Sequence, residues 1–199
     1  MDFNAAEQFL IDADPTLGQV IEFNGNLTPR PRRGNYEALV RSIIGQQISV
    51  KAAASIFDRF QEVTKLHPEM AVELTGEQVK IIGLSGQKAG YLQDLAQHFV
   101  VDPAIYDHLD TLDDDAVIAE LTRVKGVGLW TAQMFLMFTL RRPDVFAPGD
   151  RGLQLAIERI YDMPTKTSER QLQNFAERWQ PHRTTASLHL WQSLNNTPE

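Results

Sequence analysis

Cysteine is absent from the 199 residues of this chain. Its absence excludes disulfide bonds, a thiol nucleophile, and zinc or iron–sulfur centres that depend on cysteine ligands. The histidines show no spacing typical of metal ligands: they are His67, His98, His108, His182 and His189. We therefore expect no catalytic metal and no cofactor. The lack of thiols is also consistent with a reducing compartment such as the cytoplasm.

Long hydrophobic runs are missing as well. The longest strongly apolar stretch, residues 129–140, has twelve residues and is interrupted by Thr131 and Gln133, so it is too short to cross a bilayer. The first ten residues are acidic and show no basic region followed by an apolar core. We therefore expect no signal peptide, no membrane association and a cytoplasmic, nucleoid-associated location.

Positive charge is in the minority, with 19 Lys and Arg against 26 Asp and Glu and a net charge of −7. Taken alone, this balance argues against a nucleic-acid protein, because binding to phosphates normally requires a basic surface. The charges are unevenly distributed, however. Residues 102–120 hold seven acidic and no basic residues, whereas residues 28–65 hold seven basic and three acidic ones. Such a two-faced surface could bind DNA, although charge alone favours an ordinary solvated surface of mixed sign.

Alternating strand patterns are missing too, and almost every periodic segment has the spacing of an amphipathic helix, which predicts an all-α fold. Ser49 and a Thr75–Gln78 capping box mark helix starts, and Pro181 is expected at the first position of the last helix. The first 34 residues are expected to be only partly helical. Helices are expected over residues 36–44, 49–60, 75–82, 87–99, 113–124, 129–140, 150–160, 168–179 and 181–194.

The segment 121–132 places Gly-x-Gly between two of these helices, with Gly126 and Gly128 as its glycines. Both glycines can adopt backbone angles that are closed to other residues, and the N–H groups of the turn would stay exposed. Together with the positive end of the following helix, these groups can bind a phosphate oxygen without reading base sequence. Arg123 and Lys125 would add positive charge. The alternative is purely structural, because any corner between two helices can use Gly-x-Gly.

Residues 145–153 form a loop that contains proline and glycine, and Asp150 lies where a helix is expected to begin. A carboxylate at such an edge can stabilise a positively charged sugar and orient or deprotonate a water molecule. Gly149 and Gly152 would let a DNA backbone approach closely. The alternative is that Asp150 serves only as an N-cap.

Together, these segments resemble the helix–hairpin–helix DNA glycosylase superfamily, and within it the bacterial inducible 3-methyladenine DNA glycosylase II group. The resemblance implies a single two-lobed, all-α glycosylase unit over residues 1–199 with a cleft between the lobes. Lobe one would cover about 37–140, and lobe two about 1–36 plus 141–199. The resemblance extends from about Tyr36 to Trp191 and rests on residues 43–49 (IIGQQIS), 83–89 (GLSGQKA), 124–132 (VKGVGLWTA), 145–150 (VFAPGD) and 179–191.

The resemblance also implies roles for individual residues. Asp150 is the implied catalytic residue, and Trp130, Met134 and Trp191 are the implied base pocket, with ordinary core packing as the alternative for the tryptophans. The implied DNA contacts are Gln47, Ile48, Val124, Lys125, Gly126, Val127, Gly128, Gly149 and Arg151.

Within this set, the 45–49 turn would fill the gap that a flipped nucleotide leaves, with Gln47 and Ile48 as the candidates for the plug. The alternative is a helix connector with Ile48 packed in the core. Lys88 would contact a phosphate or, preferably, neutralise a carboxylate. The resemblance also allows a monovalent cation on the carbonyls of the 124–128 hairpin.

The chain departs from parts of the superfamily. Relatives that also cut the strand carry a lysine two residues after the second glycine, to form a Schiff base, and this chain has Trp130 there. A monofunctional hydrolase without AP lyase activity is therefore implied. The chain resembles a short form without the N-terminal β-rich domain of larger members. Met134 stands where those members have an aromatic residue, which leaves the substrate preference open.

The implied function is hydrolysis of the N-glycosidic bond of alkylated purines, of the 3-methyladenine and 7-methylguanine type, in double-stranded DNA. This reaction is a step of base excision repair, and it requires the damaged base to be flipped out of the duplex. One alternative is the same fold acting on deaminated or oxidised bases. Another is a non-catalytic module that binds DNA structure. We expect the chain to act as a monomer.

Overall fold

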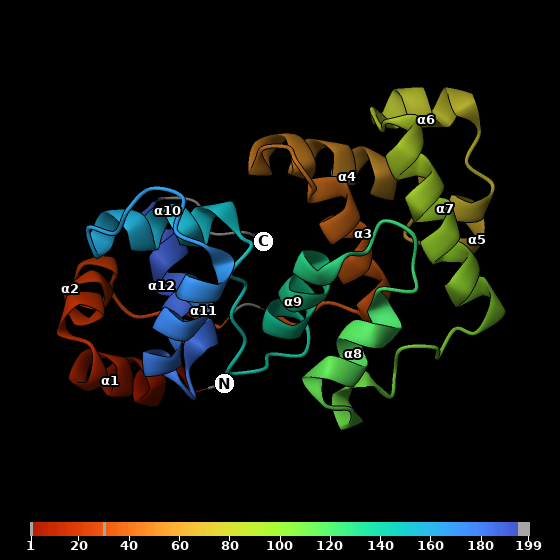
Figure 1. Cartoon of the computed structure of the whole chain (residues 1–199). Coiled ribbons are helices and arrows are strands. Elements are labelled where there is room, and N and C mark those ends of the chain that lie inside the picture. Colours follow the sequence, from red (N-terminus) through yellow and green to blue (C-terminus); the bar gives the residue numbers. More distant parts are fainter. Residues whose placement is uncertain (1, 30, 195–199) are drawn as a thin grey trace. The chain divides into compact units, whose positions relative to one another are not determined.

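The computed structural model describes residues 2–29 and 31–194, and every regular element within them is a helix. The all-α prediction is therefore confirmed. The chain divides into two compact units, which Figure 1 shows in sequence colours. The terminal unit consists of Met1–Pro31 and Arg141–Glu199, and the central unit consists of Arg32–Leu140. The chain thus begins in the terminal unit, builds the whole central unit, and then returns.

The central unit is organised around α3, which contacts α4, α7 and α9. The side chains of Leu39, Val40, Ile43 and Ile44 on α3 are fully buried. Most of α9 is buried as well, as its apolar composition predicts. The helices of this unit are α3 (Asn35–Gly45), α4 (Val50–Thr64), α5 (Pro68–Val72), α6 (Gly76–Ile82), α7 (Gly86–Val101), the 3-10 helix η1 (Leu109–Thr111), α8 (Asp114–Leu121) and α9 (Leu129–Phe138).

The terminal unit is built on α12, whose residues 184–191 are all buried and which contacts α1, α2 and α10. Asp14 joins the helices of this unit, because its carboxylate caps α2 and also accepts hydrogen bonds from Tyr161 Oη (2.7 Å) and Trp179 Nε1 (3.0 Å). The helices are α1 (Phe3–Ala13), α2 (Pro15–Asn24), α10 (Arg151–Ile160), α11 (Glu169–Ala176), the 3-10 helix η2 (Glu177–Trp179) and α12 (Arg183–Ser193).

Helix starts follow the caps that the sequence predicts. The side chain of Ser49 accepts from Ala52 N at the start of α4, and both bonds of the Thr75–Gln78 capping box are formed. The prediction for Pro181 is wrong, because α12 begins at Arg183 with His182 as its N-cap, and Pro181 precedes the cap. No helix was expected at α5, a five-residue element that is too short to show a helical period.

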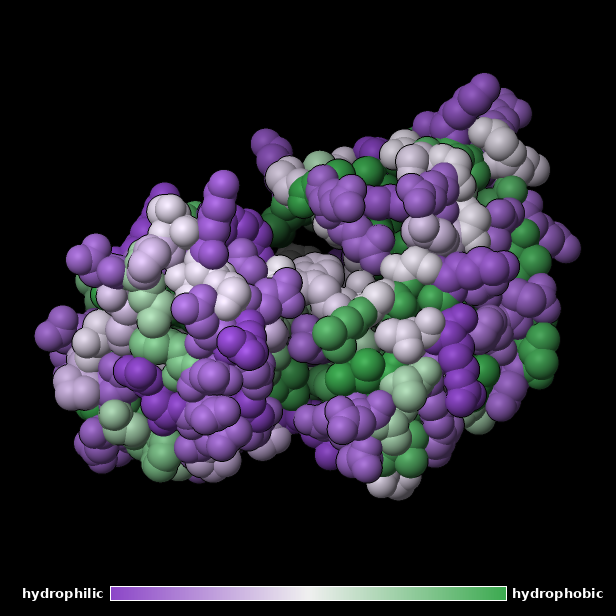
Figure 2. Space-filling model, viewed as in Figure 1, coloured by the Kyte–Doolittle hydropathy of each residue, from purple (hydrophilic) through white to green (hydrophobic). Residues whose placement is uncertain are grey.

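The surface of both units is largely hydrophilic on the face that Figure 2 shows, with apolar side chains in smaller patches. Within the described residues, no helix is both long and apolar enough to span a membrane. The large apolar side chains that remain exposed include Ile48 and Val50, which flank the start of α4, and Leu129, the first residue of α9.

A buried histidine on α12 gives the terminal unit a predicted pH dependence. Nε2 of His189 lies 3.1 Å from Oε1 of Glu7, and the amide of Asn24 lies 3.4 Å from Nδ1. Burial lowers the pKa of His189, and the hydrogen bond and the charge of Glu7 offset this only in part. This arrangement fits a neutral imidazole that donates from Nε2, because a proton on Nδ1 would face the Asn24 amide donor.

The folded chain therefore binds a proton at His189 less readily than the unfolded chain, in which the pKa is about 6.5. We expect the free energy of unfolding to fall as the pH is lowered below about 6.5, because the unfolded state then takes up a proton that the folded state resists. Thermal unfolding between about pH 5.5 and 7.5 checks this. His189→Gln should flatten the dependence, whereas the exposed His67→Gln should keep it. An unchanged slope in His189→Gln would contradict the assignment.

Candidate active site

The carboxylate of Asp150 lies at the start of α10 in the terminal unit, as its N-cap. Its Oδ1 accepts a hydrogen bond from Leu153 N (2.8 Å) and another from Trp191 Nε1 (2.8 Å). The N-terminal end of a helix favours negative charge, so the dipole of α10 complements a carboxylate at its N-cap. The N-cap alternative thus describes the conformation correctly. It does not exclude chemistry, because capping orients the same carboxylate that a catalyst needs.

Trp191 holds the carboxylate from α12. Its side chain is fully buried and its indole N–H donates to Asp150. A Cβ atom on Gly152 would lie 3.1 Å from both Trp191 Nε1 and Asp150 Oδ1. The glycine at position 152 therefore leaves room for the indole, which is a different role from the close DNA approach that the sequence suggested. The observed contact makes Trp191 a positioning residue for Asp150.

The loop before Asp150 is held by hydrogen bonds from two helices. Thr184 on α12 donates to Arg142 O (2.7 Å) and accepts from Val145 N (3.0 Å). Gln154 on α10 donates to Pro148 O at 2.9 Å. Side chains on α10 and α12 therefore hold the backbone of the loop that precedes Asp150.

Gly149 and Arg151, the neighbours of Asp150, were both predicted to contact DNA. A Cβ atom on Gly149 would lie 3.3 Å from Oε1 of Glu169, so the glycine accommodates that carboxylate. The side chain of Arg151 is 64% exposed and lies 3.7 Å from Glu158. This exposure leaves the guanidinium accessible to a phosphate.

The 124–128 hairpin lies between α8 and α9 of the central unit, and the two glycines differ. Gly126 has a φ of +80°, and a Cβ atom there would overlap the ring of Tyr91 on α7. Gly128 has an ordinary φ of −99°, and a Cβ atom there would meet no atom within 4 Å. Of the two glycines, Gly126 therefore uses a backbone angle that is closed to other residues, and Gly128 does not. Val124 and Val127 are buried, so they anchor the hairpin from within.

Gly128 is the N-cap residue of α9, and because glycine has no side chain it cannot accept a hydrogen bond from the first N–H groups of the helix. Within the described part of the chain, no hydrogen bond is found for the backbone N–H groups of Gly126, Gly128 and Leu129. These groups and the positive end of α9 form a site suited to a phosphate oxygen.

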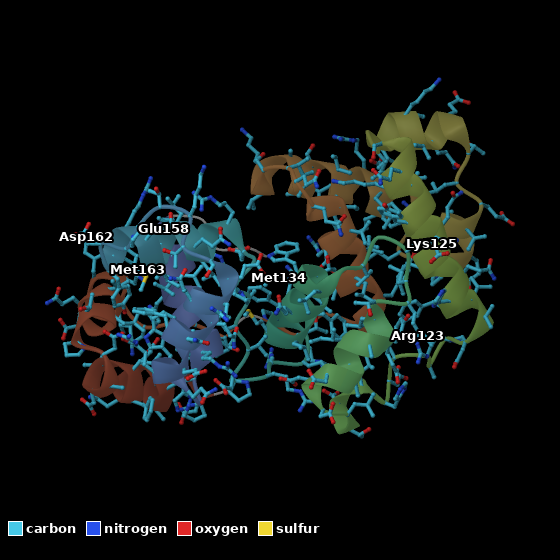
Figure 3. All side chains as sticks on the ribbon, viewed as in Figure 1. Arg123, Lys125, Met134, Glu158, Asp162 and Met163 are labelled. Atoms are coloured by element: carbon cyan, nitrogen blue, oxygen red, sulfur yellow. The ribbon has the colours of Figure 1, made fainter. Side chains whose placement is uncertain are left out.

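Lys125 has a partner that the sequence did not predict. Its Nζ lies 2.8 Å from Oδ1 of Asp94 on α7, and its backbone N–H donates to Oδ2 of the same carboxylate (3.0 Å). The hydrogen bond to Asp94 raises the pKa of Lys125. Figure 3 labels Lys125 and Arg123 on the segment that joins α8 to α9. Asp94 therefore fastens the hairpin to α7, while the side chain of Lys125 remains 75% exposed.

The basic segment 28–65 does not form an uninterrupted positive face. Arg32 pairs with Asp110 at 2.8 Å, and Arg41 pairs with Glu37 at 2.8 Å. Arg30 lies outside the described residues. These ion pairs favour the mixed-sign surface over the two-faced one.

The 45–49 turn connects α3 to α4, and its apolar residue is exposed to solvent rather than buried. Ile48 is 39% exposed, so the alternative that it packs in the core is wrong. Gln47 adopts the left-handed conformation with a φ of +58°, which is unfavourable for a residue with a Cβ atom. Nζ of Lys88 donates to Ile44 O and Gln46 O, at 2.6 and 2.7 Å. The prediction for Lys88 is therefore wrong, because its partners are backbone carbonyls, and burial lowers its pKa.

A substitution at Gln47 tests whether its left-handed conformation strains the backbone. Gln47→Gly should leave the free energy of unfolding unchanged or raise it by up to about 1 kcal/mol, because glycine accepts the left-handed conformation. Gln61→Gly, a matched change at an exposed position of α4, should instead lower it by about 1 kcal/mol. Urea unfolding measures both. Equal losses in the two variants would mean that the turn is not strained.

Trp130 and Met134 lie one turn apart on α9. Trp130 is half-buried and Met134 is buried, with 3% of its surface exposed. Figure 3 labels Met134 on this helix. Their spacing places them on one face of α9, and their role in a base pocket stays a prediction. No cluster of three or more His, Asp or Glu side chains that could hold a metal ion is found among the described residues.

Tyr91 and Asp94 were missed by the sequence reasoning, and Gln46 was included only as a member of the 45–49 turn. Tyr91 and Asp94 follow Lys88 at three-residue intervals on α7, and residues so spaced share one face of a helix. That spacing is the signal that could have indicated a common face, although it does not show what the face contacts.

Comparisons with known proteins identify the family of the chain. Residues 40–181 match the family model described as HhH-GPD superfamily base excision DNA repair protein. The DNA-3-methyladenine glycosylase 1 of Schizosaccharomyces pombe is 27% identical, over 94% of this chain and 86% of its own length. Other curated relatives are longer, and the chain spans 57–59% of four of them.

Solved structures resemble the chain over nearly its whole length. The Schizosaccharomyces pombe 3-methyladenine DNA glycosylase in complex with abasic DNA has a TM-score of 0.87 and 26% identity, and the match covers 96% of this chain and 97% of that one. The DNA-3-methyladenine glycosidase of Bacillus halodurans has a TM-score of 0.77 and 31% identity, with 94% and 88% covered. The resemblance inferred from the sequence motifs is confirmed: this chain belongs to the HhH-GPD superfamily of base excision DNA repair proteins.

Proposed function

We propose that this chain is a monofunctional DNA glycosylase that hydrolyses the N-glycosidic bond of alkylated purines in duplex DNA. The observation that carries the proposal is the carboxylate of Asp150, held at the N-terminus of α10 by Leu153 N and Trp191 Nε1. The chain's family and the printed names of its relatives support the choice of reaction.

Cleavage of the N-glycosidic bond requires negative charge near the sugar rather than a strong general acid. Alkylation at N3 or N7 makes a purine cationic, so the base is already a good leaving group. As its bond to the sugar breaks, positive charge develops on the deoxyribose, and a fixed carboxylate stabilises that charge without having to reorganise. The two hydrogen bonds to Oδ1 of Asp150 supply the fixed orientation. The same carboxylate can orient or deprotonate the attacking water.

The absence of an amine at the key position supports hydrolysis without strand cutting. A lyase needs a nucleophilic amine to form a Schiff base with the sugar. Trp130 stands two residues after Gly128, where such relatives carry lysine. The proposed enzyme therefore releases a free base and leaves an intact abasic strand.

In this proposal, side chains of α9 recognise the damaged base. A cationic purine is attracted to the face of an aromatic ring, by about 0.5–2 kcal/mol. Trp130 is the aromatic candidate, and it is half-buried rather than enclosed. Met134, one turn later, adds a polarisable side chain. Trp191 acts instead through Asp150, because its side chain is fully buried and its N–H is committed to the carboxylate.

Two turns of the central unit would hold the DNA. The N–H groups at the start of α9 would bind a phosphate oxygen, and Gln47 and Ile48 would fill the gap left by the flipped nucleotide. Neither contact reads a base edge, so binding should depend on DNA shape and damage rather than on sequence. We propose that a single copy of the chain suffices for this reaction.

The test is release of free base from duplex DNA carrying one lesion at a time, measured in a single turnover with a chromatographic readout. We expect release of 3-methyladenine and 7-methylguanine, and no strand cutting until alkali is added. Release confined to hypoxanthine, uracil or an oxidised purine would still support a DNA glycosylase, but it would contradict alkylated purines as the substrates. Binding to damaged duplex without release of any base would instead favour a non-catalytic DNA-binding module.

A further inference from the structure

The 45–49 turn is tied to the 124–128 hairpin by one side chain. Nε2 of Gln46 donates to Gly126 O at 2.8 Å and to Thr131 Oγ1 at 3.2 Å. Gly126 lies in the hairpin, and Thr131 lies in the first turn of α9. The amide of Gln46 therefore spans the two segments that the proposed function assigns to DNA, although they are 80 residues apart in the sequence.

The main chain of the 45–49 turn is held by Lys88 on α7. Its ammonium bonds to the carbonyls of Ile44 and Gln46, at the C-terminal end of α3. Positive charge is favourable at this end of a helix. The turn therefore cannot move away from α7 without breaking two charge-assisted hydrogen bonds.

The hairpin rests on the same helix. The ring of Tyr91 packs against Gly126, and Asp94 binds both the backbone N–H and the ammonium of Lys125. One face of α7 thus carries Lys88 for the turn, and Tyr91 and Asp94 for the hairpin. Within the 83–89 motif, these contacts give Lys88 a structural role in holding the turn.

We propose that Gln46 is a positioning residue that fixes the 45–49 turn at a set distance from the 124–128 hairpin, so that both form one preorganised DNA-binding unit. The inference rests on the proposed function, because it assumes that the turn fills a gap in the base stack while the hairpin binds a phosphate. A damaged site needs both contacts at once, and a preset spacing removes the entropy cost of ordering them on binding. An undamaged duplex needs the phosphate contact alone.

The experiment compares affinity for a duplex with a stable abasic-site analogue to affinity for the same duplex undamaged. Gln46→Ala should lower the ratio of these affinities about tenfold, since it removes two hydrogen bonds, and should change binding to undamaged duplex by no more than about twofold. Gln61→Ala, at an exposed position of α4, is the matched control and should keep the wild-type ratio. Thr131→Val, which is nearly isosteric and removes only the Oγ1 acceptor, should lower the ratio about threefold.

The outcomes distinguish the proposed mode of DNA binding from the positioning role of Gln46. A wild-type ratio near one would overturn the proposed mode of DNA binding itself. A clear wild-type preference that Gln46→Ala and Thr131→Val both retain would show that Gln46 does not position the turn. Equal losses on both duplexes would assign Gln46 a general structural role, which also overturns the inference. If Gln46→Ala fails to fold, the result for Thr131→Val decides.

Discussion

Asp150→Asn is expected to abolish base release from methylated duplex DNA while leaving the fold intact. Loss of the negative charge removes the stabilisation of the sugar cation, and we expect the single-turnover rate to fall by at least about a hundredfold. Asparagine caps a helix about as well as aspartate. Its side-chain oxygen can still accept from Leu153 N and Trp191 Nε1, so the melting temperature should stay close to that of the wild type.

A matched variant separates charge from orientation. Trp191→Phe keeps a buried ring but removes the indole N–H that donates to Asp150. We expect a smaller loss of rate, about tenfold, because the carboxylate loses a hydrogen bond that orients it while its charge remains. Equal release by the wild type and Asp150→Asn would show that Asp150 is not the catalyst.

Gly128→Ala is expected to weaken binding to every duplex while sparing the fold. A Cβ atom there meets nothing within 4 Å, and the φ of −99° suits alanine. The cost to stability should not exceed about 1 kcal/mol, the difference between glycine and alanine at an N-cap. The added methyl group would stand beside the N–H groups at the start of α9 and keep a phosphate oxygen away, so we expect about tenfold weaker binding.

Gly126→Ala is the contrasting change in the same hairpin. Its φ of +80° and the overlap with Tyr91 make the alanine side chain incompatible with the fold, and we expect about 3 kcal/mol of destabilisation. Binding should be lost together with stability. Fluorescence anisotropy on two unrelated duplex sequences, alongside urea unfolding, measures both effects. If Gly128→Ala binds both duplexes as tightly as the wild type, the hairpin does not hold a phosphate at this helix start.

Much of the secondary structure could be predicted because helix starts are encoded locally. Ser49, Thr75 and Asp113 each cap the helix that follows them, within three residues of the N–H that they accept from. The helix α5 was missed because its five residues are too few to show a helical period. The error at Pro181 has a related cause, since a proline preference does not decide which of the neighbouring residues becomes the cap.

The candidate site was predictable only as far as residue types and their order allow. Asp150 could be identified by its loop and its place in the chain, but its bond to Trp191 joins residues 41 positions apart. Lys88 reaches carbonyls 42 and 44 positions away. No spacing rule connects such pairs, so the sequence assigned Trp191 to the pocket and Lys88 to a phosphate or a carboxylate. Packing decides what these side chains contact.

The most direct test is a crystal structure of the chain bound to a duplex with an abasic-site analogue. We expect an extrahelical sugar within about 5 Å of the Asp150 carboxylate, where its charge acts strongly. We also expect a phosphate oxygen about 3 Å from a backbone N–H of the 124–128 hairpin. A bound duplex in which every sugar lies more than about 10 Å from Asp150, a full screening length, would contradict the role given to that carboxylate.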